Sequence, residues 1–365
     1  MVQVQMSSTS KSGPSNNSTF IEYLGNGGIM ELNSNQPHKR ILNCMDGLNP
    51  NCDSVWYFAE LHSETMTLDF FETSEDNKVF DYKDILSWCF SVLDHSPSAR
   101  LMLKEAIQQD WIVALDDLEG GEYCLDAENR VLILDNNSLV PSALGRSHYF
   151  KNIILMTLVK ALRDIWQEKR HGGFEEKYTA DTVLLMERIR AADLDVMVVL
   201  AAWELRSEDY PQVWRHILGS EISDMAMTYS KYLERDPSSQ FNGNALNAAF
   251  KQWFHDIDRI NSCDHDALEY MDEILATCDL LNPFGISHPK RMDVEILSCL
   301  PDKTAYLQGH GPEILSNPMY AAVDNEINQS HLLHIMYDLE AVVVQDVPFR
   351  DADLAKKIFP LETQS

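Results

Sequence analysis

Residues 147–169 read SHYFKNIILMTLVKALRDIWQEK, and this stretch decides the fold. Its apolar residues recur at the three- and four-residue spacing of an α-helix. Leu155, Val159 and Trp166 extend the apolar surface almost around the whole helix, which is typical of a helix buried on all sides. We therefore predict a central helix here, which ends at Gly172-Gly173.

The segments around this helix predict an α+β fold, in which a mainly helical domain carries a small antiparallel sheet. Strand patterns occur at 111–115, 123–125 and 131–134, with one or two more strands within 55–71. Helical spacing occurs at 84–93, 98–109, 181–206, 211–218, 220–234, 244–260 and 266–278. Ser220 and Asp264 stand where helix N-caps are expected.

Composition divides the chain into three parts. Residues 1–50 are rich in Gly, Asn, Ser and Pro and predict a flexible tail, in which Gly25-Asn26-Gly27-Gly28 is a turn. Residues 51–280 hold the mainly helical domain. Residues 281–365 predict an irregular extension with short helices, for example at 329–339 and 351–358.

The charge balance restricts the classes of partner. The chain has 57 Asp and Glu against 29 Lys and Arg, a formal net charge of −28. Such a surface repels phosphate backbones and anionic lipids, so we expect no nucleic acid and no membrane as partners. The longest apolar run, Val196–Trp203, is too short to span a bilayer. A basic protein is the partner that this charge favours.

The cysteines indicate a reducing compartment. The sequence has seven, an odd number without a Cys-x-x-Cys pair, which fits neither a disulfide framework nor a thiolate zinc site. We therefore expect reduced thiols in a cytoplasmic protein.

A strand pair followed by a long buried helix is the layout of minimal zinc peptidases. In those enzymes the helix carries His-Glu-x-x-His, because histidines four residues apart can both reach a zinc ion while the Glu polarises its water. The corresponding positions here are Lys160, Ala161 and Asp164. A protonated lysine cannot ligate zinc, and alanine cannot act as a base.

Longer blocks of sequence, from about Ser98 to Leu275, carry a resemblance to a known family. The blocks are Ala161-Leu162-Arg163-Asp164-Ile165-Trp166-Gln167-Glu168, Glu187-Arg188-Ile189-Arg190-Ala191-Ala192-Asp193, Ala202-Trp203-Glu204-Leu205-Arg206, Trp214-Arg215-His216, Gly219-Ser220-Glu221, Asp224-Met225-Ala226-Met227 and Gln252-Trp253. The chain resembles a bacterial, largely alphaproteobacterial, family labelled "putative metallopeptidase". The resemblance implies a zincin-like outline and a possible zinc ion, but the chain departs from the zinc motif at every ligand position.

Charged residues inside apolar sequence need partners, because an unpaired buried charge costs several kcal/mol. The predicted charge network comprises Lys160, Arg163, Asp193, Asp195 and Glu204. We expect Lys160 or Arg163 to meet one of the three acids across two helices. A cationic side chain would then occupy roughly the place of a metal.

Other residues could hold a metal or act in catalysis without the standard motif. Glu204 and Glu221 are the catalytic candidates, and His216, Asp224 and His255 are the metal-ligand candidates. His331 and His334 form an i, i+3 pair that would need a further carboxylate.

Three hypotheses about function follow. The first is a non-catalytic binding or regulatory protein whose metal motif is degenerate. The second is an active metal-dependent peptidase or hydrolase with unconventional ligands. The third is a helical scaffold without a peptidase role.

Overall fold

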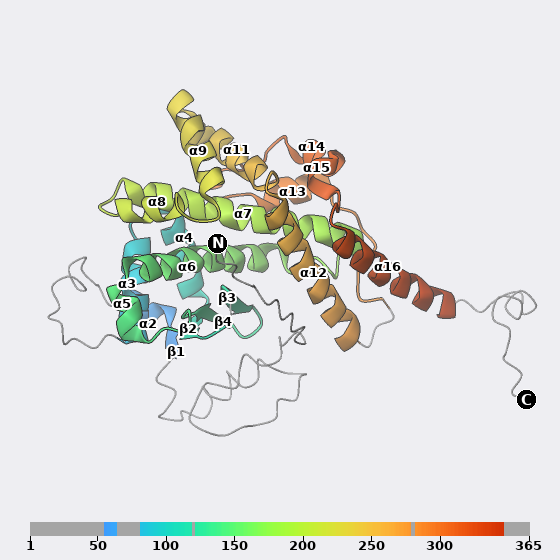
Figure 1. Cartoon of the computed structure of the whole chain (residues 1–365), viewed down its shortest axis with the longest axis horizontal. Helices are drawn as coiled ribbons and strands as arrows, with labels where there is room; N and C mark the ends of the chain where they lie inside the picture. The colour runs from blue at the N-terminus through green and yellow to red at the C-terminus, as the bar shows by residue number, and fades with distance from the viewer. Residues whose placement is uncertain (1–54, 64–80, 119–120, 279–281, 347–365) are drawn as a thin grey trace, which may run out of the picture.

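Two long antiparallel helices form the centre of the computed structural model, which describes residues 55–63, 81–118, 121–278 and 282–346, the last seven by backbone only. Helix α6 spans His148–His171 and helix α7 spans Ala180–Arg206, and the two pack along their length. In Figure 1 they run side by side through the middle of the molecule. The sequence therefore predicted the central helix and its neighbour correctly.

Local chemistry sets the ends of α6. The Ser147 side chain accepts a hydrogen bond from the Phe150 amide at 3.3 Å and so satisfies one of the free amides of the first turn. At the other end Gly172 adopts φ +63°, which a glycine reaches without steric cost. The chain then turns back, and α7 follows after eight residues.

A four-stranded sheet lies against one side of α6. Its strands are β1 (Val55–Tyr57), β2 (Ile112–Asp116), β3 (Tyr123–Asp126) and β4 (Val131–Asp135), in the order β1-β2-β4-β3. β2 and β4 pair in parallel, whereas the two outer pairs are antiparallel. The predicted strands at 111–115, 123–125 and 131–134 are thus confirmed, but the sheet is mixed rather than antiparallel. Of the region 55–71, in which one or two strands were predicted, 55–57 is a strand, 58–63 is helical and 64–71 lies outside the described residues.

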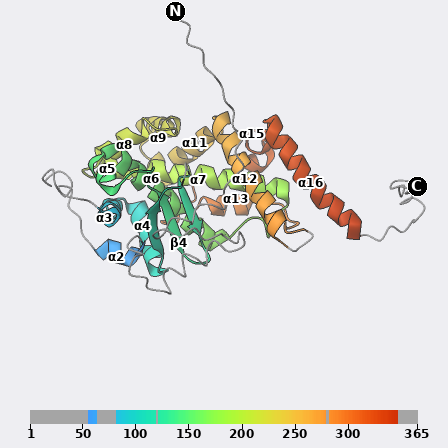
Figure 2. The ribbon, with the colours of Figure 1, turned by 60° about the horizontal axis from the view of Figure 1, so that its bottom comes forward.

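The remaining helices surround α6 and α7. Before α6 come α2 (Phe58–Ser63), α3 (Tyr82–Leu93), α4 (Pro97–Gln108) and α5 (Pro141–Arg146). After α7 come α8 (Pro211–Ile217), α9 (Ser223–Arg235), α10 (Ser239–Asn242), α11 (Asn244–Trp253) and α12 (Ile257–Thr277). The last are α13 (Arg291–Leu297), α14 (Gly311–Ser316), α15 (Pro318–Ala321) and α16 (Glu326–Asp346). Figure 2 shows α16 projecting beyond the other elements.

Three helix boundaries differ from the sequence prediction. The segment 244–260 is broken, because the Asp256 side chain accepts hydrogen bonds from the amides of Asp258 and Arg259 and starts α12 there. Asp264 is therefore no N-cap but a buried residue inside α12. Ser220 does not cap α9 either, since its hydroxyl donates to the Ile217 carbonyl.

Two buried arginines attach residues 297–322 to the central helices. Arg163 on α6 donates to the carbonyls of Leu297 and Cys299, each at 3.1 Å. Arg188 on α7 donates to the carbonyls of Tyr320 and Ala322 at 2.8 and 3.0 Å. These backbone segments therefore complete the core built by α6 and α7, while the predicted division of the chain at residue 280 stays a prediction.

Within the described residues no helix is both long and apolar enough to cross a membrane. The predicted helix 329–339 is confirmed and extends over the whole of α16. The predicted tail 1–50, its turn at Gly25–Gly28 and the predicted helix 351–358 lie outside the described residues.

Candidate functional site

Lys160, which the comparison of the sequence with zinc peptidases predicts to replace their first histidine, forms two ion pairs. Its Nζ lies 2.7 Å from Oε2 of Glu122, which precedes β3, and 3.3 Å from Oδ1 of Asp195 on α7. Burial alone would lower the pKa of Lys160, but the carboxylates of Asp195 and Glu122 outweigh it and raise the pKa above its usual value. Lys160 is therefore a cation held between two carboxylates.

The two other residues that were compared with the zinc motif, Ala161 and Asp164, lie in different environments. Ala161 is completely buried in the core. Asp164 accepts a hydrogen bond from the Tyr123 hydroxyl of β3 at 3.0 Å. Burial raises the pKa of Asp164, although Arg190, the Tyr123 hydroxyl and Lys160 each oppose this shift.

These residues do not fit a zinc ion. A charged ammonium has no lone pair for the metal, and Ala161 offers no base to activate a metal-bound water. Only Asp164 could act as a ligand, and a single carboxylate is not a site.

Beside Asp164 several acidic side chains surround a single arginine, Arg190 of α7. Its guanidinium donates to the Gly172 carbonyl at 2.8 Å, lies 3.3 Å from Glu168 and reaches Glu187 at 3.9 Å. We call this group the Arg190 cluster, and its members are Tyr123, Asp164, Glu168, Glu175, Glu187, Arg190 and Tyr270. Carboxylates from α6 and α7 thus share one cation, and Glu175 of the connecting loop interacts with Glu187 and Tyr270.

In this cluster the positive charge of Arg190 does not fully compensate the carboxylate of Glu187. Burial raises the pKa of Glu187 to about 7. Arg190 opposes this rise, but the neighbouring carboxylates of Asp164, Glu175 and Glu168 add to it. Sequence reasoning missed Glu187 and Arg190. Their signal was the i, i+4 pair Asp164 and Glu168 on α6 together with an i, i+3 pair of opposite charge on α7.

Arg163 and Asp193 form the most deeply buried of the predicted pairs. Arg163 Nε lies 2.6 Å from Asp193 Oδ2, and both side chains are within 1% of complete burial. Asp193 also accepts hydrogen bonds from Gln167 and from the Tyr306 hydroxyl. Because every oxygen of this carboxylate is satisfied, the pair stabilises the core and offers no open position to a ligand.

Four of the five predicted network residues form two separate ion pairs, Lys160 with Asp195 and Arg163 with Asp193, and Glu204 lies apart. Asp195 is shared between Lys160 and the indole Nε1 of Trp253, at 2.9 Å from the latter. Glu204 instead accepts hydrogen bonds from the Ser98 amide and hydroxyl at the start of α4, at 3.1 and 2.7 Å. This carboxylate satisfies one free amide at a helix N-terminus, so its observed contacts are structural.

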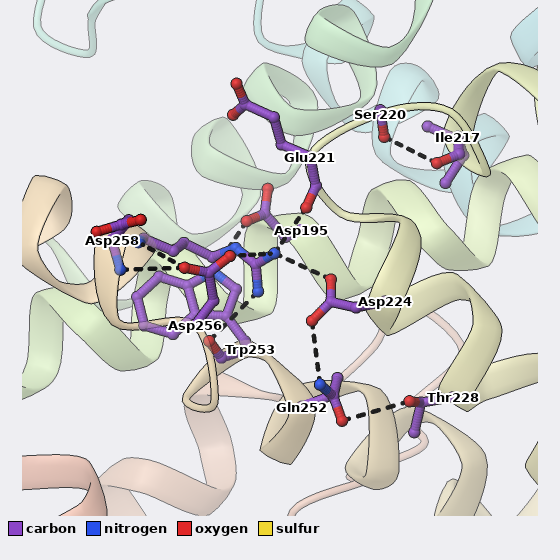
Figure 3. A network of polar contacts seen from close by, with 11 residues as sticks. Asp195, Ile217, Ser220, Glu221, Asp224, Thr228, Gln252, Trp253, Asp256 and Asp258 are labelled. Carbon is purple, nitrogen blue, oxygen red and sulfur yellow. Dashed lines mark hydrogen bonds and ion pairs between the residues drawn. The ribbon is translucent and has the colours of Figure 1, made fainter.

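Arg259 of α12 contacts both Glu221 and Asp224, two candidates that Figure 3 labels. Its Nη2 donates to the Glu221 backbone carbonyl at 2.8 Å and to the Asp224 carboxylate at 3.0 Å. The second Asp224 oxygen accepts from the Gln252 amide at 3.1 Å. Asp224 is thus neutralised by an arginine, and the side chain of Glu221 is exposed to solvent.

The candidate histidines lie apart from these groups. His216 packs against the ring of Tyr149, and burial lowers its pKa. His255 is exposed, and His331 pairs with Asp272 at 2.6 Å while His334 faces Asp338. Across residues 55–63, 81–118, 121–278 and 282–346, no three His, Cys, Asp or Glu side chains are grouped so that they could hold a metal.

A surface cavity of about 510 Å³ opens at the C-terminal end of α6. Its lining includes His171, Gly172, Lys177 and Ser287. Burial, together with Arg190, lowers the pKa of His171 to about 4, so its imidazole is neutral at physiological pH. None of the candidates predicted from the sequence lines this cavity.

Comparison with known proteins gives one match. The model of the family described as "Putative metallopeptidase family (DUF6782)" matches residues 61–306. No curated protein and no solved structure matches the chain. The zincin-like outline predicted from the resemblance therefore stays a prediction.

Proposed function

Because the family match covers more than half of its length, the chain belongs to the putative metallopeptidase family, and we propose that it is a non-catalytic member that binds a basic protein partner. One observation carries the proposal. Lys160 stands at the first ligand position of the zinc motif and forms ion pairs with Glu122 and Asp195. A fixed cation there repels a metal cation.

The Arg190 cluster supports a binding role over a purely structural one. It lies beside the Lys160–Asp164 stripe and has more carboxylates than cations, as does the chain as a whole. A helical scaffold has no need of partly buried charges that are poorly compensated. An excess of carboxylates favours a ligand that brings positive charge.

An active hydrolase with unconventional ligands has less support. Its candidate residues were His216, Glu221, Asp224, Glu204 and His255. Asp224 is paired with Arg259, Glu204 contacts the start of α4, and the two histidines lie on different elements. These positions supply no common centre for a reacting group.

Zinc analysis of the purified full-length protein tests the proposal. We expect no stoichiometric zinc after incubation with the metal and dialysis. The variant Lys160→His/Asp164→His should bind zinc, because it places two imidazoles one helical turn apart beside Glu122 and Asp195. A matched control, Lys231→His/Arg235→His, has the same spacing on the exposed face of α9 and should bind zinc more weakly.

One outcome of the zinc analysis would contradict the proposal. Stoichiometric zinc in the wild-type protein, lost together with cleavage of a peptide substrate in Glu204→Gln or Glu221→Gln, would show an active peptidase. The proposal would then be wrong.

A further inference from the structure

Glu175, on the loop of residues 172–179 that joins α6 to α7, is weakly held in the Arg190 cluster. Its Oε1 accepts a hydrogen bond from the Tyr270 hydroxyl of α12 at 3.4 Å. Its Oε2 is buried and has no hydrogen-bond partner among the described residues. The carboxylate packs against Gly173, where a Cβ would overlap it. One long hydrogen bond therefore fixes this side chain, and its second oxygen is buried without a donor, which is unfavourable.

The charges of the Arg190 cluster favour displacement of this carboxylate. Arg190 is the cationic member of the cluster, and its guanidinium lies 3.3 Å from Glu168 and 3.9 Å from Glu187. The three carboxylates other than Glu175 are fixed on α6 and α7, which pack along their length, whereas Glu175 lies on the connecting loop. When all four are ionised, movement of Glu175 is therefore the easiest way to relieve their mutual repulsion.

The same loop forms one wall of the cavity at the C-terminal end of α6. The cavity is lined by His171, by Gly172, Gly173, Glu176 and Lys177 of the loop, and by Gly285, Ile286 and Ser287. The Gly285 amide donates to the Glu175 carbonyl at 2.7 Å, and the Ser287 carbonyl accepts from the Thr179 amide at 3.2 Å. The Ser287 amide donates to the Lys177 carbonyl at 3.2 Å. Movement of the loop therefore loosens these bonds and changes the cavity.

We propose that the Arg190 cluster is a pH-sensitive switch, in which ionisation displaces Glu175 and opens the loop 172–179 at the cavity wall. When Glu187 holds a proton, three carboxylates share Arg190 and the loop stays closed. When Glu187 loses this proton, four carboxylates face one guanidinium, and Glu175 moves out into solvent. The switch does not require the proposed binding role.

Glu187 sets the pH range of the switch, because burial raises its pKa to about 7. The groups that face it are Asp164 and Glu168 of α6, Arg190 of α7, Glu175 of the loop, and Cys263 and Tyr270 of α12. Tyr123 of β3 and Lys160 of α6 face Asp164 in turn. Burial raises the pKa values of Cys263 and Tyr270 above their usual values, so neither group ionises between pH 6 and pH 8.

Two histidines lie near the loop. His171 lines the cavity, but burial and Arg190 lower its pKa to about 4, so its imidazole is neutral from pH 6 to pH 8. The other is His288, whose Nδ1 lies 3.1 Å from the Thr182 hydroxyl. His288 is therefore the alternative source of pH dependence that an experiment has to separate from Glu187.

Hydrogen–deuterium exchange of the full-length protein between pH 6 and pH 8 tests the switch. Each measured rate is divided into the intrinsic rate at the same pH, which gives a protection factor for local opening. We expect the protection factors of the Thr179, Gly285 and Ser287 amides to fall by about threefold to tenfold over this range. The upper figure applies if Glu187 regains its ordinary pKa of 4.5 in the open state.

Two variants of adjacent residues locate the source. Glu175→Gln and Glu176→Gln remove the same charge from the loop, but only Glu175 belongs to the cluster, and Glu176 is exposed. In Glu175→Gln the protection factors should stay nearly constant from pH 6 to pH 8, because ionised carboxylates do not repel a neutral amide. Glu176→Gln and His288→Asn should both show the fall of the wild type.

Three results would overturn the inference. One is an equal response of Glu175→Gln and Glu176→Gln, because the displaced carboxylate is then not that of Glu175. Another is loss of the fall in His288→Asn, which would assign the pH dependence to that imidazole. The third is loop amides that are as strongly protected as those in the middle of α7 at each pH, since they would then exchange only when the whole protein unfolds.

Discussion

The buried arginines of this protein bind backbone carbonyl groups as well as carboxylates. Arg163 and Arg188 each pair with one aspartate, Asp193 and Asp264, and each donates to two carbonyl groups of the C-terminal part. The planar guanidinium suits this role because its several donors point in fixed directions. A lysine could not replace either residue with the same set of bonds.

Arg163→Met should therefore be strongly destabilising. It leaves the Asp193 carboxylate buried without its cation, and removing one partner of a buried pair costs about 3–5 kcal/mol. Urea unfolding measures the loss. The control Arg215→Met, at an exposed position, should change the free energy of unfolding by less than about 0.5 kcal/mol. A similar loss in both variants would contradict the buried pair.

Glu187 should make the stability depend on pH. Its folded-state pKa, about 7, lies above its ordinary value of 4.5. Between these values the folded protein holds a proton that the unfolded chain has released, so the free energy of unfolding falls as pH rises. At about 1.4 kcal/mol per pKa unit, the fall attributable to Glu187 is about 3 kcal/mol.

Glu187→Gln should remove much of this fall, so that the variant is more stable than the wild type at pH 8 and similar to it near pH 4.5. Burial also raises the pKa of Asp164 and Glu168, which leaves a smaller fall in the variant. Urea unfolding across the pH range checks the prediction. The exposed Glu234→Gln should keep the wild-type profile. If the free energy of unfolding of Glu187→Gln depends on pH as that of the wild type does, Glu187 is not the cause of the fall.

At the scale of elements, the sequence predicted which segments are helices and strands better than it predicted how they pair. The consecutive strand segments around residues 111–134 suggested a sheet with antiparallel neighbours. However, β2 and β4 are buried along almost their whole length, whereas β3 is partly exposed. A continuous apolar run indicates a central strand and a mixed pattern indicates an edge strand, which gives the observed order.

In the candidate site, likewise, the sequence predicted some contacts and missed others. Opposite charges on two buried helices predicted the ion pairs of Lys160 and Arg163. Glu204, in contrast, also stands within apolar sequence, yet its partners are Ser96 and Ser98, about a hundred residues away in the chain. No pattern along a single sequence reports such a distant contact.

Glu204 should stabilise the start of helix α4. Glu204→Ala removes the acceptor for the Ser98 amide and for the hydroxyls of Ser96 and Ser98, so we expect a loss of about 1–3 kcal/mol. Urea unfolding provides the measurement, with the exposed Glu208→Ala as a neutral control. If Glu204→Ala leaves the free energy of unfolding unchanged, these contacts do not support the helix.

The whole molecule depends on contacts between the central helices α6 and α7 and residues 297–322. A chain that stops at Cys278 lacks the carbonyl partners of Arg163 and Arg188 and the Tyr306 hydroxyl that binds Asp193. We expect it to lose cooperative unfolding in urea, whereas a chain that stops at Asp346 should keep it. Cooperative unfolding of the shorter chain would show that residues 282–346 are dispensable for the core.

The two arginine attachments also have a consequence for protein synthesis. Arg163 and Arg188 are synthesised more than a hundred residues before the carbonyls of Cys299, Tyr320 and Ala322 exist. During that interval their guanidinium groups cannot be enclosed with all their partners, so the nascent chain must keep α6 and α7 open to water. Native burial of these helices therefore waits until residues 297–322 have left the ribosome, and until then the growing chain exposes them to chaperones.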